Sequence, residues 1–159
     1  MVKVRAVVLA AGQGTRMKSQ LPKVMHPLLG RPMVWHSVQA AAAATGAAPV
    51  VVVGVGGEQV QQALGTQAAY AIQEQQLGTA HAVAQAEKHL RGQSDLVLVT
   101  FADMPLLTEA ILREMIDEQM AHPESAFTML TVTQQDARGF GHILRDAQGS
   151  VQAIVEDAH

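Results

Sequence analysis

The sequence contains no cysteine, which excludes disulfide bonds and metal sites built from thiolates. It also carries little charge: 16% of its residues are Asp, Glu, Lys or Arg, and the formal net charge is -3. A chain with this balance has no electrostatic attraction to nucleic acid or to an anionic membrane surface. We therefore expect neither of these as a partner.

Residues 32–57 contain no formally charged residue, which raises the question of a membrane span. His36, Thr45 and Pro49 interrupt this segment, whereas a spanning helix needs about 20 predominantly apolar residues. We expect a buried helix followed by a buried strand instead. The first apolar strand begins directly after Met1-Val2-Lys3, which leaves no room for a signal peptide, so we expect a cytoplasmic protein.

The hydrophobic content of 48% is typical of a globular protein. A chain of 159 residues buries roughly 70% of its unfolded surface, which is enough to form one core. The sequence therefore predicts a single domain over residues 1–159.

Strand-like and helix-like segments alternate along the chain. Runs rich in β-branched residues predict strands at 4–9, 50–53, 68–72, 95–100 and 127–133. Helices are predicted at 32–45, 58–64, 79–89, with Thr79 as N-cap, and 108–120. A hairpin of residues 142–145 and 151–156 is expected around the turn-forming residues 146–149. This alternation predicts an α/β fold with a Rossmann-like, mostly parallel sheet and helices on both faces.

The first strand runs into a loop of small residues that is suited to binding phosphate. Gly12 and Gly14 lack Cβ atoms, so the backbone N–H groups there can approach an anion closely. Arg16, Lys18 and Lys23 add three cations to the same segment. An ordinary Gly-containing turn is the alternative, and the cations favour the phosphate loop.

Two familiar phosphate motifs do not fit this loop. A dinucleotide-binding fingerprint requires a third small residue where this chain has Met17, and the P-loop requires a Gly-Lys-Ser/Thr sequence that is absent. A second glycine cluster, Gly54-Val55-Gly56-Gly57, is not followed by a cation, so we interpret it as a plain turn.

The first loop resembles the signature of the nucleotidyltransferases that activate sugar phosphates. The resemblance covers nearly the whole chain and is strongest to the N-terminal uridylyltransferase domain of the bacterial bifunctional N-acetylglucosamine-1-phosphate uridylyltransferase/glucosamine-1-phosphate acetyltransferases. The matching segments are Leu9–Met17, Pro22-Lys23, Gln73–Ala82, Phe101–Leu106, Gly139–Ile143 and Ile154–Glu156. The resemblance implies a nucleotide-diphospho-sugar transferase fold that is truncated at its C-terminus in this chain.

The resemblance also implies a role for each matching residue. Arg16 and Lys23 are the expected catalytic cations, and Asp103 is the expected ligand of Mg²⁺. The nucleotide-binding residues would be Leu9, Ala10, Ala11, Gly12, Gly14, Thr15, Gln73, Gln76, Gly78 and Thr79. The sugar-binding residues would be Phe101, Ala102, Gly141 and Glu156.

The residue types agree with these roles. Asp103 follows a buried strand, and Mg²⁺ attached to substrate phosphates prefers such oxygen ligands, although capping the turn before Pro105 is an alternative role. The amides of Gln73 and Gln76 are donor and acceptor at once, as the edge of uracil requires, whereas in isolation they would indicate only a polar surface.

The implied reaction is attack by the phosphate of N-acetylglucosamine 1-phosphate on the α-phosphorus of UTP, which releases pyrophosphate and serves the synthesis of cell-envelope precursors such as peptidoglycan. Both substrates are small molecules. The alternatives are a nucleotidyltransferase for another base or acceptor, and a nucleotide-binding module without turnover because the chain is truncated. We also expect an unpaired edge of the hairpin at residues 142–156 to favour self-association.

Overall fold

The computed structural model describes residues 2–12, 14, 17–54, 56–136, 139 and 141–155. The chain divides into two compact units, Met1–Thr128 and Met129–His159. The expectation of one domain over the whole chain stays a prediction.

The first unit is built on a parallel sheet of four strands. These are β1 (Val4–Ala10), β4 (Val50–Gly54), β5 (Ala69–Gln73) and β6 (Leu96–Phe101), in the order β5-β4-β1-β6. Val8 in β1 pairs with Val51 on one side and with Thr100 on the other. The strand that precedes the glycine loop is therefore hydrogen-bonded along both edges.

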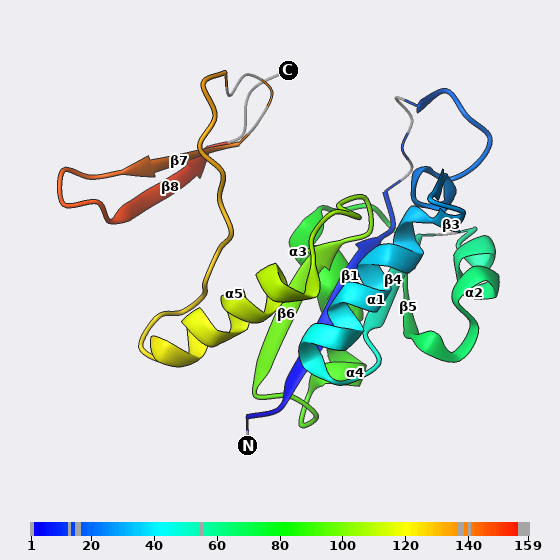
Figure 1. Ribbon diagram of the computed structural model, residues 1–159, viewed down its shortest axis with the longest axis horizontal. Helices are drawn as coiled ribbons and strands as arrows, with labels where there is room; N and C mark the ends of the chain where they lie inside the picture. Colours follow the sequence, from blue (N-terminus) through cyan, green and yellow to red (C-terminus); the bar gives the residue numbers. More distant parts are fainter. Residues whose placement is uncertain are drawn as a thin grey trace. The chain divides into compact units, whose positions relative to one another are not determined.

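Helices cover both faces of this sheet, as the sequence predicts (Figure 1). Side chains alternate along β1, so that Ala6 and Val8 belong to one core and Val7 belongs to the other. The first core is completed by α1 (Met33–Thr45), α2 (Glu58–Leu64) and α5 (Glu109–Ala121). The second core is completed by α3 (Thr79–Gln85) and α4 (Glu87–Leu90).

The uncharged segment 32–57 becomes the buried helix and strand that the sequence predicts, namely α1 and β4. None of the described helices is long and apolar enough to cross a membrane. α1 packs beside α5 on the first core, where Arg113 donates a hydrogen bond to the carbonyl oxygen of Ala43 at 2.8 Å.

Two helix ends agree with the capping residues that the sequence predicts, and one does not. Gly46 ends α1 at φ 68°, and Thr108 caps α5 by accepting a hydrogen bond from the backbone nitrogen of Ile111. The prediction that Thr79 is an N-cap is wrong, because Gly78 occupies that position at φ 99° and Thr79 is already helical. The helix predicted over 79–89 is also divided at Ala86 into α3 and α4.

A small hairpin was not predicted from the sequence. Strand β2 (Pro27–Leu28) pairs with β3 (Arg31–Pro32), and the two residues between them, Leu29 and Gly30, both have positive φ. Such a turn favours Asn or Gly at both positions, and because Leu29 is neither, the sequence gives no turn signal there. Short 3₁₀ turns lie at Lys23–Met25 (η2) and Gly65–Gln67 (η3).

The strand predicted at 127–133 is wrong. These residues form neither helix nor strand, and the side chains of Phe127 and Val132 are exposed. Sequence pattern alone does not make a strand, because its backbone groups need a neighbouring strand, and none of the described segments pairs with this one.

The second unit contains the predicted antiparallel hairpin of β7 (His142–Arg145) and β8 (Val151–Val155). The Asp146 carboxylate holds the turn by accepting hydrogen bonds from the backbone nitrogens of Gln148 at 3.0 Å and Ser150 at 2.8 Å. Self-association through the edge of this hairpin stays a prediction.

Replacing Gly46 with alanine should lower the free energy of unfolding by about 1–2 kcal/mol, because an added Cβ strains the left-handed conformation. Beyond the chain neighbours of Gly46, none of the described residues places an atom within 4 Å of this Cβ, so the change isolates the backbone effect. Chemical denaturation measures it. Gly46→Asn is the control, because Asn tolerates positive φ, and it should lower the free energy of unfolding by less. An equal decrease for both variants would contradict this explanation.

Candidate functional site

A cavity of about 530 Å³ lies in the first unit at the carboxyl ends of β1, β5 and β6. From β1 the chain continues to β4 and β5 on one side, and then returns to β6 on the other side. Ligands of open parallel sheets bind where the direction of the connections reverses in this way. The order of the strands therefore places the cavity beside the end of β1.

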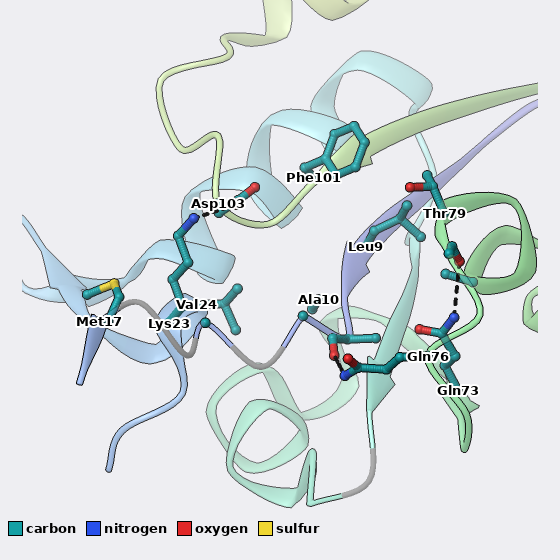
Figure 2. Close-up of a pocket in the computed structure, with 15 residues that line it drawn as sticks. Leu9, Ala10, Met17, Lys23, Val24, Gln73, Gln76, Thr79, Phe101 and Asp103 are labelled. Atoms are coloured by element: carbon teal, nitrogen blue, oxygen red, sulfur yellow. Dashed lines mark hydrogen bonds and ion pairs between the residues drawn. The ribbon is translucent and has the colours of Figure 1, made fainter. Parts of the chain in front are cut away.

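Most of the residues selected from the sequence line this one cavity (Figure 2). They are Leu9, Ala10, Ala11, Gly12, Gly14, Lys23, Gln73, Gln76, Gly78, Thr79, Phe101 and Asp103. Sequence reasoning missed Met17, Val24 and Ala82, which also line it. Their apolar side chains carry no chemical signal of their own, and only their positions could have indicated them: Met17 and Ala82 lie within matching segments, and Val24 directly follows Lys23.

Other selected residues lie elsewhere. Ala102 is fully buried and does not line the cavity; its backbone nitrogen donates to the carbonyl oxygen of Leu9 at 2.9 Å. Gly141 belongs to the second unit. Thr15, Arg16 and Glu156 lie outside the described residues.

The glycine loop is shaped by close packing at Gly14. This residue has φ 60°, and a Cβ atom there would lie 2.6 Å from the Cβ of Lys23. Beyond its chain neighbours, none of the described residues places an atom within 4 Å of a Cβ at Gly12. Gly14 therefore permits the approach of Lys23.

Lys23 and Asp103 form the charged wall of the cavity. Their Nζ and Oδ2 atoms lie 2.7 Å apart, and both side chains are more than one third exposed. An exposed ion pair of this kind contributes at most about 1 kcal/mol to stability. The ion pair matters more for geometry than for stability, because it joins the segment after the glycine loop to the end of β6.

Two glutamine amides form a second, uncharged wall. Gln73 is buried, and its Nε2 atom donates to the carbonyl oxygen of Gly78 at 3.2 Å. The Nε2 atom of Gln76 donates to the carbonyl oxygen of Ala11 at 2.7 Å, which ties this side chain to the glycine loop (Figure 2). The cavity thus combines a neutral side with directional hydrogen-bonding groups and a charged side at Lys23 and Asp103.

The donor set fits a divalent cation that arrives with a substrate. Among the described residues, no group of three or more His, Asp or Glu side chains could hold a metal ion by itself. Mg²⁺ commonly takes one or two carboxylates from the protein and its remaining ligands from phosphates and water. Asp103 is the one carboxylate among the described residues that line the cavity, which matches that arrangement and does not match a permanently bound structural metal.

Comparison with known proteins identifies the family. The model of the MobA-like NTP transferase domain matches residues 6–154. The chain belongs to this family. The prediction of a nucleotidyltransferase with an α/β fold is thereby confirmed.

The chain is 47% identical over 156 residues to the bifunctional protein GlmU of Geobacillus thermodenitrificans. This match covers 98% of the chain and 34% of the relative, so the chain spans about a third of the length of this curated relative. The predicted resemblance to the N-terminal domain of such bifunctional enzymes is confirmed.

Solved structures agree on the fold. Rv0371c from Mycobacterium tuberculosis superposes with a TM-score of 0.66 at 21% identity, and the match covers 76% of this chain and 62% of that one. A complex of Rv0371c with manganese gives a TM-score of 0.62 at 21% identity, with 75% and 60% coverage.

Gly14→Ala should weaken binding of a nucleoside triphosphate at least about 10-fold, equivalent to 1.4 kcal/mol, because the new methyl group displaces Lys23. Gly30→Ala is the matched control: it has similar backbone strain at φ 79°, but beyond its chain neighbours no described residue would lie within 4 Å of its Cβ. Calorimetric titration measures binding and thermal unfolding measures stability. Equal binding by both variants would show that Lys23 tolerates displacement.

Proposed function

We propose that this domain transfers UMP from UTP to N-acetylglucosamine 1-phosphate, giving UDP-N-acetylglucosamine and pyrophosphate. The observation that carries the proposal is the pairing of two walls in one cavity: Gln73 and Gln76 on one side, and Lys23 and Asp103 on the other. The identity to GlmU proteins supports the choice of uridine and of this sugar phosphate.

The neutral wall suits the base. Uracil presents one ring N–H between two carbonyl groups, and glutamine amides, together with backbone N–H groups near Gly78 and Thr79, can match such an edge. The charged wall suits phosphates, since the ammonium group of Lys23 reaches the same cavity. Substrate phosphates would compete with Asp103 for this ammonium group.

The chemistry needs no general base. The second pKa of a phosphate monoester is about 6, so the attacking phosphate is already ionised at neutral pH. Catalysis then consists of aligning the two phosphates and neutralising their charge. Lys23 would supply fixed positive charge. Arg16 is assigned the same role from the sequence motif alone.

Asp103 would hold Mg²⁺ with the substrate phosphates. The ion would supply further neutralisation of the charge that develops on the phosphate oxygens. The manganese complex of Rv0371c, a structure with the same fold, supports the proposal of a divalent cation here.

The remaining assignments are parts of the same proposal. Phe101 lies at the cavity where a sugar phosphate would approach, and Gly141 and Glu156 are assigned to the sugar from their motifs alone. The proposed setting is the cytoplasm, where UDP-N-acetylglucosamine would supply peptidoglycan synthesis.

Pyrophosphate release tests the proposed reaction. We expect release with UTP, N-acetylglucosamine 1-phosphate and Mg²⁺ together, and much less when CTP or GTP replaces UTP or glucose 1-phosphate replaces the sugar phosphate. Thermal unfolding provides a second readout, because a ligand that binds the native state raises the melting temperature. UTP with Mg²⁺ should raise it more than CTP or GTP does. Equal shifts with all three nucleotides would contradict the assignment to uridine.

Lys23→Ala should reduce turnover by about 10²-fold, the effect of removing one group that stabilises transition-state charge. Lys88→Ala is the matched control, because Lys88 carries the same charge on α4 and does not line the cavity. Initial rates of pyrophosphate release measure both variants. Near-normal turnover by Lys23→Ala would remove Lys23 from the catalytic machinery.

A further inference from the structure

The amide of Gln73 is held from two directions. The residue is 4% exposed, and its Nε2 atom lies 3.2 Å from the carbonyl oxygen of Gly78 and 3.1 Å from the Nδ1 atom of His81. A backbone carbonyl only accepts hydrogen bonds, so the group that faces Gly78 is the amino end of the amide. Its second hydrogen is then directed to His81.

The ring of His81 also has a second amide beside it. Gln85, one helical turn later in α3, places its Nε2 atom 3.1 Å from the Nε2 atom of His81. A neutral imidazole has one lone pair and one N–H, so it can accept a hydrogen bond from only one of the two glutamines.

Burial decides which of the two glutamines donates a hydrogen bond to the lone pair of His81. Each amide also donates to a backbone carbonyl, Gln73 to Gly78 and Gln85 to His81. Gln85 is half-buried, so its amide can turn over and accept a hydrogen bond from the ring through Oε1. Its amino group then loses the bond to the His81 carbonyl and donates to water instead. Gln73 is buried, so turning its amide over would leave the amino group without a hydrogen-bond partner, which costs about 1–3 kcal/mol. His81 therefore carries its proton on Nε2 and accepts at Nδ1.

The orientation of Gln73 follows from this arrangement. Both hydrogens of its amino group are engaged, and the Oε1 atom points to the side of the cavity on which Gln76 lies (Figure 2). Within the described part of the chain, this oxygen accepts no hydrogen bond. Gln73 thus offers a ligand an acceptor and no donor.

We propose that His81 is a positioning residue that locks the Gln73 amide with Oε1 toward the cavity, and so makes the site select a base with a ring N–H over one with a ring lone pair. The inference rests on the proposed function, in which that base is uracil. Uracil donates from N3–H, whereas N3 of cytosine is an acceptor and would face Oε1 unpaired. A buried group without a partner is what allows a polar site to reject a near-identical ligand.

His81→Leu removes one of the two acceptors of the Gln73 amino group and leaves the Gly78 carbonyl alone to hold the amide against turning over. The ratio of the dissociation constants of CTP and UTP should fall at least about 10-fold, mainly through weaker UTP binding. His81→Asn retains an acceptor near the position of Nδ1 and should recover most of the selectivity. Gln85→Leu removes the other neighbour of the ring and should leave the ratio unchanged. Calorimetric titration of this chain with UTP and CTP in the presence of Mg²⁺ gives these constants.

The outcomes separate this inference from the proposed function. A wild-type chain that binds UTP and CTP equally would overturn both. A selective wild-type chain whose His81→Leu variant is equally selective would overturn only the role of His81. Nitrogen NMR of the wild-type ring tests the same point without substitution: a proton on Nε2 and a hydrogen-bonded lone pair on Nδ1 are expected, and the opposite tautomer would overturn the inference.

Discussion

The pairing of β1 along both of its edges is the constraint on which the first unit depends. β4 and β6 bond to opposite sides of this strand, and its side chains enter the cores on both faces. A strand that is enclosed in this way can open to solvent only at its ends. Because the connections reverse direction at β1, the cavity lies beside its carboxyl end, and Gly12 and Gly14 of the glycine loop line it.

The cavity obtains its chemistry from segments that are far apart in the sequence. Lys23 follows β1 and Asp103 follows β6, yet their charged atoms lie 2.7 Å apart. Gln73 ends β5 and reaches both Gly78 and the first turns of α3. The charged side and the neutral side are therefore set by different strands, which allows a phosphate and a base to be bound by separate groups. Such a separation supports the proposal that this site binds a nucleotide.

Much of this organisation could be predicted from sequence. β-branched runs, helix ends such as Gly46 and Thr108, and the glycine loop are encoded within a few residues, and their predicted positions agree with β1, α1 and α5. Motif resemblance selected most of the residues that line the cavity. Apolar lining residues such as Met17 and Val24 were not selected, because packing alone brings them to the cavity.

The sequence by itself determined most of the local elements, the fold class and the types of group at the site, because these depend on side-chain pattern over short distances. The tertiary structure decided which of these groups interact. Residues 127–133 have the composition of a strand but form none, because a strand requires a partner that local sequence does not provide. In the same way, nothing in the sequence around Gln73 states that its amide is shared between Gly78 and His81. That arrangement exists only because β5 and α3 meet at a buried position, where every polar group must find a partner.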